Sequence, residues 1–203
     1  RLAAISEIGV SVAKDISFFG HDIAMGITPK FVRVQTYDYR FTGAQLDNAS
    51  ISLGEGKRIE SNVNMDLGLA KAFGNGWRAG FAVKNLFTQT YKTALGNELT
   101  VSPQARVGVV HHNGWSTVAA DLDLTENDRA GFDAKTRYLG VGAEFDAWHD
   151  AQLRVGYRYN VADSKTSIFT GGVGISPFGI HLDLAIAGNP HEIAAALQTG
   201  YRF

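Results

Sequence analysis

The feature that most constrains this chain is a regular alternation of apolar residues with polar or very small ones. In residues 61–73 the odd positions from Val63 to Leu69 are apolar, whereas the even positions from Asn62 to Ala70 are polar or tiny. Successive side chains of a β-strand point to opposite faces, so a period of two predicts strands with one apolar face. No stretch approaches the roughly 18 apolar residues that a membrane-spanning helix needs. We therefore expect an all-β chain.

The alternation recurs along the whole chain. It is present in residues 77–87, 99–111, 116–124, 138–145, 152–160, 180–187 and 193–203. Extended segments are also predicted around 8–12, over 22–41 with an interruption at Pro29, and over the glycine-rich residues 167–175. Together with residues 61–73, the total is about eleven strands of roughly 9–14 residues, which is long enough to cross a bilayer at a tilt.

The two faces of these strands differ in charge. One face is almost free of charge, whereas the other carries both signs and many glycines. A charge at the centre of a bilayer costs about 2–4 kcal/mol, so lipid requires a charge-free face. We therefore predict an antiparallel up-and-down transmembrane β-barrel whose lumen holds a lattice of ion pairs. The lattice residues are Asp66, Arg106, Asp121, Asp123, Glu144, Arg154, Arg158, Asp183 and Arg202. A soluble two-layer sandwich also has one apolar face and remains the alternative.

The connections between the expected strands alternate in length. Residues 74–76 and 112–114 are tight Asn-Gly turns, whereas residues 88–97 and 125–135 are long. Outer-membrane barrels have short periplasmic turns and longer external loops. Residues 42–60 are then the longest external loop. Aromatic residues gather near the strand ends, as membrane interfaces require: Phe18, Phe19, Tyr37, Tyr39, Trp77, Phe87, Trp115, Trp148, Tyr201 and Phe203.

The strand count also predicts how much of a barrel is present. With about eleven strands and a last strand that ends in the periplasm, the first strand would start outside the cell. A single-chain bacterial barrel has an even number of strands and both ends in the periplasm. We therefore expect residues 1–203 to be one barrel domain that lacks its opening strands.

Composition and motifs argue against several other classes of function. The net charge of −1 provides no basic field for nucleic acid, and the chain has no cysteine for disulfides, thiolate metal sites or nucleophilic catalysis. His111 and His112 are neighbours on a strand and would face opposite sides, so no metal site is expected. Asp121 and Asp123 share a face and could be paired catalytic carboxylates, but a lattice of ion pairs explains them better. Without a nucleophile elbow or a phosphate loop, we expect neither an enzyme nor a cofactor.

Several short motifs resemble a known family. They are VAADLDLTEN (118–127), GVGAEF (140–145), LRVGYRYN (153–160), GVGISPFGIHLDLAIA (172–187) and the terminal GYRF. Two further segments, AVKNLF (82–87) and MDLGLAKAF (65–73), resemble the same family. These segments are similar to the conjugal-transfer TraF-like family of envelope barrels, which is related to the FadL-type transporters of hydrophobic compounds.

The resemblance implies a barrel of about fourteen strands in the bacterial outer membrane, of which this chain holds the later part. It implies contact with outer-membrane lipid and with the barrel assembly machinery, which would read the terminal aromatic residues Tyr201 and Phe203. The implied function is passive transport of small hydrophobic molecules. The alternative is an envelope component that transports nothing and presents external loops to a conjugation or secretion partner.

Two departures limit what the resemblance carries over. The conjugation protein of the same name that contains a thioredoxin-like domain needs a CxxC motif, and this chain has no cysteine. The amino-terminal plug and the ligand pocket of FadL-type transporters would lie largely upstream of Arg1. No ligand-binding residue is therefore transferred from that group.

The barrel and the soluble sandwich predict different behaviour in detergent. A folded outer-membrane barrel should migrate differently on a gel before and after boiling, and it should require detergent to stay in solution. A protein that is soluble without detergent and whose mobility does not change on heating would favour the sandwich.

Overall fold

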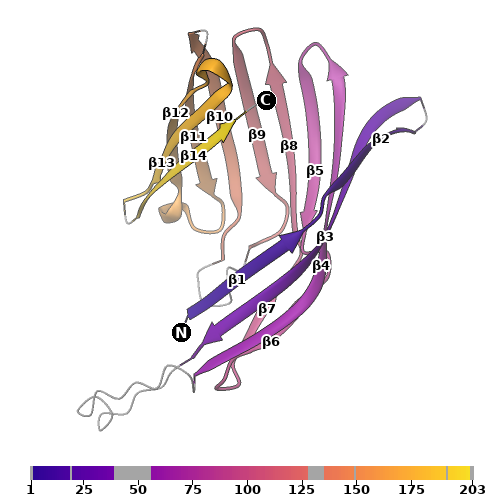
Figure 1. Ribbon diagram of the computed structural model, residues 1–203, viewed down its shortest axis with the longest axis vertical. Helices are drawn as coiled ribbons and strands as arrows, with labels where there is room; N and C mark the ends of the chain where they lie inside the picture. The colour runs from indigo at the N-terminus through magenta and orange to yellow at the C-terminus, as the bar shows by residue number, and fades with distance from the viewer. Residues whose placement is uncertain are drawn as a thin grey trace.

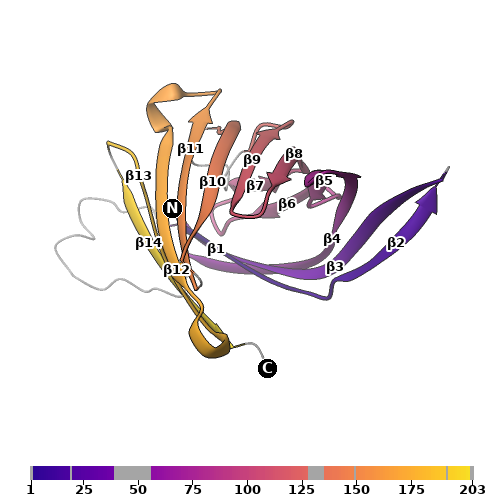
Figure 2. The same cartoon turned by 90° about the horizontal axis from the view of Figure 1, so that it is seen from above.

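The computed structural model describes residues 2–18, 20–38, 56–127, 135–148, 150–190 and 192–201. Almost all of this chain is strand, and the strands form one large curved antiparallel sheet (Figures 1 and 2). Its members are β1 (Leu2–Gly9), β2 (Val12–Phe18), β3 (His21–Tyr37), β4 (Lys57–Gly74), β5 (Trp77–Lys84), β8 (Gln104–His112), β9 (Ser116–Asp123), β10 (Tyr138–Trp148), β11 (Ala151–Asn160), β12 (Ile168–Ile175), β13 (Ile180–Gly188) and β14 (Ile193–Tyr201).

Three smaller elements lie outside this sheet. The strands β6 (Gln89–Lys92) and β7 (Glu98–Val101) form a separate hairpin. Two short 3-10 turns, η1 (Ser164–Thr166) and η2 (Pro177–Gly179), lie in connections between strands. No helix in the described ranges is long and apolar enough to cross a membrane.

The order of the strands is that of an up-and-down barrel. The 12-stranded sheet runs β1-β3-β4-β5-β8-β9-β10-β11-β12-β13-β14, and β2 shares the β1 edge of β3. In the view from above, the sheet curves into an open trough (Figure 2). The edge formed by β1 and β2 does not pair with β14, so the sheet is a partial barrel. The predicted all-β antiparallel class is confirmed, and so is the count of about eleven strands across the sheet.

The edge strand is broken, whereas β3 is not. The sequence predicted an interruption at Pro29, but β3 continues through this residue, which lies opposite Met65 of β4. The break lies instead between β1 and β2, where the amide of Val10 donates to the Pro29 carbonyl at 3.2 Å. The N–H and C=O groups of one strand residue point toward the same neighbouring strand. The side on which Pro29 has no N–H to donate is therefore the side of this break, where no ladder bond is lost.

Five predicted boundaries were wrong. Residues 8–12 are not one strand, because they contain the break between β1 and β2. Residues 99–111 are not one strand either, because Leu99 belongs to β7, which ends at Val101, and β8 begins only at Gln104. Residues 57–60 are part of β4 rather than of the external loop, because they pair with the end of β3. The long connection 88–97 contains β6. The strand predicted over 77–87 stops at Lys84, because Asn85 takes a positive φ of 53°.

The register aligns apolar residues with apolar residues across the sheet. One row runs through directly opposed residues of seven neighbouring strands: Met25, Leu69, Phe81, Val107, Leu122, Leu139 and Tyr159. Leu67, Val107 and Leu182 are 36%, 38% and 40% exposed, so this apolar face is uncovered among the described residues. It points away from the trough, because the β6–β7 hairpin packs on the opposite face of β3, inside the curve of the sheet (Figure 2). No second sheet covers this face anywhere in the described chain, as a two-layer sandwich would require.

The end of the sheet that carries the short turns β4–β5, β8–β9 and β10–β11, here called the short-turn rim, has the expected turn residues. Gly74, Asn75 and Gly76 all have positive φ, which glycine and asparagine tolerate. The next turn on this rim is held by the Asn113 side chain, whose oxygen accepts from the amides of Trp115 and Ser116. The three tryptophans of the chain, Trp77, Trp115 and Trp148, all lie at this rim and are exposed. Of the other predicted girdle residues, Phe19, Tyr39 and Phe203 lie outside the described residues, as does the Phe18 side chain.

The β6–β7 hairpin packs on the trough side of β3. Tyr91 and Leu99 are buried against Val32 and Val34, which makes the one hydrophobic cluster of fully buried residues in the described ranges. Burial raises the pKa of the Tyr91 phenol, because the charged form would lose its hydration. Because the folded state favours the neutral phenol, the phenol contributes to the stability of the fold at neutral pH. This contribution is lost as the pH rises through the pKa of the phenol in the folded state. The hairpin should therefore loosen in strong alkali.

The hairpin allows a matched test of this packing. Leu99→Ala should destabilise the hairpin by about 2–5 kcal/mol, because Leu99 is 0% exposed. Leu95→Ala, in the exposed tip of the same hairpin, should change its stability by less than about 0.5 kcal/mol. Hydrogen exchange of the β6 and β7 amides measures both effects. Equal protection in the two variants would contradict the packing.

Candidate functional site

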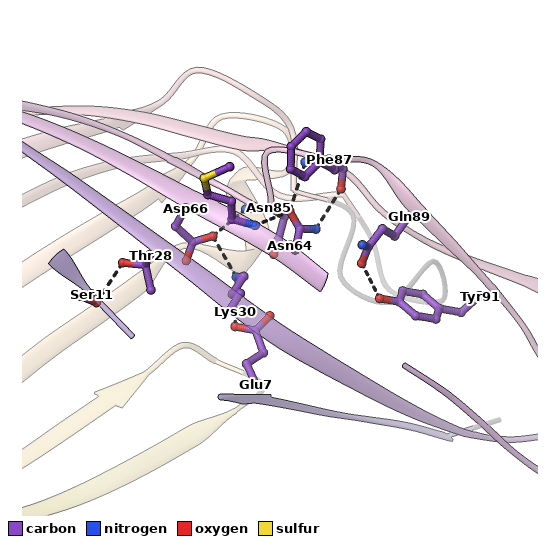
Figure 3. Close-up of polar contacts among 11 residues, drawn as sticks. Glu7, Ser11, Thr28, Lys30, Asn64, Asp66, Asn85, Phe87, Gln89 and Tyr91 are labelled. Carbon is purple, nitrogen blue, oxygen red and sulfur yellow. Dashed lines mark hydrogen bonds and ion pairs between the residues drawn. The ribbon is translucent and has the colours of Figure 1, made fainter. Parts of the chain in front are cut away.

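Three groups of charged side chains lie on the polar face of the sheet. In each group one cation is held between two carboxylates. The first group joins β1, β3 and β4: Lys30 Nζ lies 3.1 Å from Glu7 Oε2 and 2.9 Å from Asp66 Oδ1 (Figure 3). Lys30 is only 5% exposed, so these two contacts replace the water that its ammonium loses. Asp66 also accepts from the Asn85 amide at 2.8 Å, which fixes the turn after β5.

The second group lies at the long-loop end of β8 and β9. Arg106 Nε donates to Asp123 at 2.7 Å, and its guanidinium lies 3.4 Å from Asp121 Oδ1. Asp123 is 2% exposed, and its other oxygen accepts from the Tyr138 amide at 3.0 Å and from Asn127 at 3.1 Å. Asp123 therefore ties β8, β9 and β10 together through a fully hydrogen-bonded carboxylate.

The third group crosses a strand. Arg154 of β11 donates to Glu144 of β10 at 2.5 Å and also to Asp183 of β13, on the far side of β12. The Arg154 side chain can pass over β12 to reach Asp183 because β12 has a glycine, Gly174, at this point. A Cβ on Gly174 would lie 2.5 Å from Asp183 Oδ1 and 3.4 Å from the Arg154 guanidinium. Glycine at this position therefore lets long charged side chains lie close to the wall.

The remaining predicted lattice residues have different surroundings. Arg158 lies over the Tyr138 ring at 4.4 Å, a cation–π contact rather than an ion pair. Arg202 lies outside the described residues. The charges therefore form separate clusters and not one continuous lattice among the residues described. Sequence reasoning omitted Lys30, although the alternation of β3 places it on the polar face with Thr28. The function of the clusters remains a prediction.

The predicted assembly signal is only partly described. Tyr201 ends β14, opposite Ile180, and its side chain is exposed. Phe203 lies outside the described residues.

The two histidines face opposite sides, as predicted. The His111 ring lies 4.6 Å from the Trp77 ring on the apolar face, and His112 contacts Thr117 at 2.9 Å. The described residues contain no group of three or more His, Asp or Glu side chains arranged to hold a metal ion.

A hollow with an apolar floor lies on the same face as the charged clusters. Its volume is about 650 Å³, within the usual range of small-molecule pockets. On this face its floor consists of small side chains together with Val110, and the charged residues Arg78, Arg106 and Asp121 border it. The small residues of the floor on this face are Ala13, Ala24, Gly26, Gly68, Ala70, Gly80, Ala82, Gly108 and Ala119.

The hollow arises because the strand register places small residues directly opposite one another. One row joins directly opposed residues, Ala13, Gly26, Gly68 and Ala82, and ends at Arg106. The neighbouring row joins Ala24, Ala70, Gly80 and Gly108, and ends at Asp121. Sequence reasoning missed the hollow because glycine and alanine were counted with the polar positions. The only local signal was the run of small residues at alternate positions of β4 and β5.

The third charged group gives a test of the wall. Arg154→Met should lower the stability of the folded barrel by about 1.5–3 kcal/mol, because Glu144 and Asp183 lose their shared donor. The midpoint of urea unfolding in detergent measures the loss. Adding Glu144→Gln and Asp183→Asn to this variant should recover most of it, because no unpaired charge remains. Arg78→Met is the control, since the described residues show no carboxylate paired with Arg78. Equal losses for Arg154→Met and Arg78→Met would contradict the pairing.

Two solved structures share this fold. The toluene transporter TbuX of Ralstonia pickettii superposes with a TM-score of 0.64 at 16% identity, over 99% of this chain and 68% of that protein. The toluene transporter TodX of P. putida gives 0.58 at 12% identity, over 97% of this chain and 67% of that protein. At these identities the likeness is one of fold. The predicted likeness in fold to transporters of hydrophobic compounds is confirmed.

Sequence comparison identifies a family. No curated protein sequence matches the chain. The profile of a family described as "F plasmid transfer operon, TraF, protein" matches residues 1–123, which include the hollow, the β6–β7 hairpin and two of the three charged clusters. Because that match covers more than half of its length, the chain belongs to the TraF family.

Proposed function

We propose that this chain forms part of an outer-membrane barrel through which small hydrophobic molecules pass without an energy source. The observation that carries the proposal is the hollow of about 650 Å³, with its floor of glycine and alanine, on the trough side of the sheet. Two proteins of the same fold are toluene transporters. An apolar guest gains about 25 cal/mol for each Å² of surface that it buries in such a hollow.

The outer face supports a location in the bacterial outer membrane. Large apolar side chains such as Val63 and Leu197 are well exposed there, and the charged clusters lie on the opposite face. This distribution suits lipid outside and a polar lumen inside. The partners that follow are outer-membrane lipid and the barrel assembly machinery, for which Tyr201 and Phe203 are the proposed signal. The proposal contains no catalytic step and no cofactor.

We assign to the small residues of the hollow the role of leaving space for the cargo. Gly68 has nothing within 4 Å of the position that a Cβ would take, so a larger side chain there would extend into open space. The charged clusters are assigned to the structure of the wall, because their charges are already paired with one another. On this view cargo passes over glycine and alanine and does not bind to the ion pairs.

A second candidate function is that of an envelope component that transports nothing and presents its external loops to a conjugation or secretion partner. The family description, which names a plasmid transfer operon, is the observation that favours it. Of the predicted external loop 42–60, residues 57–60 belong to β4, whose Lys57 end lies on the long-loop side of the sheet. Residues 42–55 lie outside the described part of the chain.

Filling the hollow should separate the two candidates. Cells that express the full-length gene should take up labelled toluene faster than a deletion strain. Gly68→Phe should reduce uptake to the level of the deletion strain, because the ring would occupy the hollow. Ala196→Phe, on the trough face of β14 and outside the hollow, should leave uptake unchanged.

The same experiment contains its own check on folding. Heat-modifiable gel mobility should be retained in both variants, which shows that each inserts as a barrel. Equal uptake by the expressing strain and the deletion strain would count against transport. A change in plasmid transfer frequency between the same two strains would then support the second candidate.

A further inference from the structure

The outer face of the sheet changes in character along β1, β3 and β4. On the outer face, Ile8, Phe31 and Val63 lie directly opposite one another and are exposed. Two residues farther toward the long-loop end, the next outer-face row is Ser6, Arg33 and Ser61, which are also directly opposed. The outer face therefore becomes polar at one level across all three strands.

The trough face changes in the opposite sense at the same level. Before the change it carries Lys30 with its two carboxylates. Beyond it lie Val32 and Val34, which are buried under Tyr91 and Leu99 of the β6–β7 hairpin. On β3 the apolar residues therefore lie outside in one part and inside in the other, and β1 follows with Ile5 and Ala3 on its trough face. On β4 only the outer face changes, because its trough face beyond this level carries Asn62, Glu60 and Arg58.

The two arrangements suit different solvents. A sheet in water buries its apolar face against a second layer and turns polar residues outward. A barrel wall in lipid turns its apolar residues outward. Because both arrangements occur on β1 and β3, and the outer face of β4 becomes polar at the same level, we infer that this level marks the change from hydrocarbon to water. The hydrogen-bonded register makes that level common to neighbouring strands.

The length of the apolar part agrees with a bilayer. On β4 the stretch from Val63 to Phe73 covers eleven positions, and a tilted strand needs about 9–11 residues to cross. Its outer-face residues are apolar except Lys71, whose ammonium lies 5.3 Å from the Phe73 ring near the short-turn rim, where a long side chain can reach the lipid headgroups. Phe73 and Trp77 are exposed at the short-turn rim, where an aromatic belt belongs. Measured from that rim, the hydrocarbon ends at the same level at which the faces exchange.

We propose that the outer surface of the bilayer lies between Phe31 and Arg33 on β3 and between Val63 and Ser61 on β4. The parts of β1, β3 and β4 beyond it, with the β6–β7 hairpin, form a two-layer extension that stands in water. Figure 1 shows these strands projecting past the ends of β5, β8 and β9. The inference rests on the proposed outer-membrane location.

The extension is held together at both ends of the hairpin. At the base, the Asn64 side chain donates to the Phe87 carbonyl at 2.9 Å and accepts from the Phe87 amide at 3.1 Å (Figure 3). At the tip, buried Asp38 accepts from Thr93 at 2.8 Å and from Asn97 at 2.6 Å. These bonds and the small core give the extension cohesion without lipid.

Two single-cysteine variants test the boundary, because the natural chain has no cysteine. Ile59→Cys and Leu67→Cys lie on the same outer face of β4, and the native side chains are 41% and 36% exposed in the protein alone. The full-length variants are folded into phosphatidylcholine vesicles and treated with a water-soluble maleimide. Reaction in urea gives the intrinsic rate of each thiol.

We expect I59C to react at a rate close to its rate in urea and L67C to be strongly protected. Fast reaction of both would mean that neither site is in lipid, which overturns the membrane location as well. Protection of both would leave the membrane location intact and overturn the extension. Protection of I59C alone would overturn the assigned direction of the boundary.

Discussion

The rest of this structure depends on the register of the antiparallel backbone ladder. Side chains alternate between the two faces of a strand, so a slip of one residue would exchange the faces of that strand completely. The observed register keeps Leu69, Phe81 and Val107 in line on the outer face and Gly80 beside Gly108 on the trough face. The apolar outside, the glycine and alanine floor and the charged clusters are all consequences of this one alignment.

The trough face combines two kinds of residue that depend on each other. Arginine and lysine side chains are long, and on a crowded wall they reach carboxylates on neighbouring strands only if the intervening positions are small. Gly174 provides that space beneath Arg154, and the rows of glycine and alanine between β2 and β9 provide more of it than the ion pairs occupy. The excess space is the hollow. A wall built in this way is crossed by ion pairs at some positions and is open where only small residues lie.

The proposed extension on β1, β3 and β4 would use the hydrophobic effect in both directions. In the part assigned to lipid, large apolar residues lie outside and the trough carries charged clusters and small residues. In the part assigned to water, Val32, Val34, Tyr91 and Leu99 are buried between two layers. The transition requires no change in secondary structure, because β3 and β4 run through it without interruption. Only the identity of the alternate residues changes.

The sequence by itself determined the strands, their two faces and the tight Asn-Gly turns, because these depend on neighbours only a few residues apart. It also placed Asp66, Asp121, Asp123, Arg154 and Asp183 on a common polar face. The tertiary structure decided which of these charges meet, that Leu99 belongs to the hairpin instead of joining β8, and that small residues from six strands adjoin in one hollow. Those features depend on pairing between strands far apart in the chain, and local periodicity contains no information about which positions will stand opposite each other.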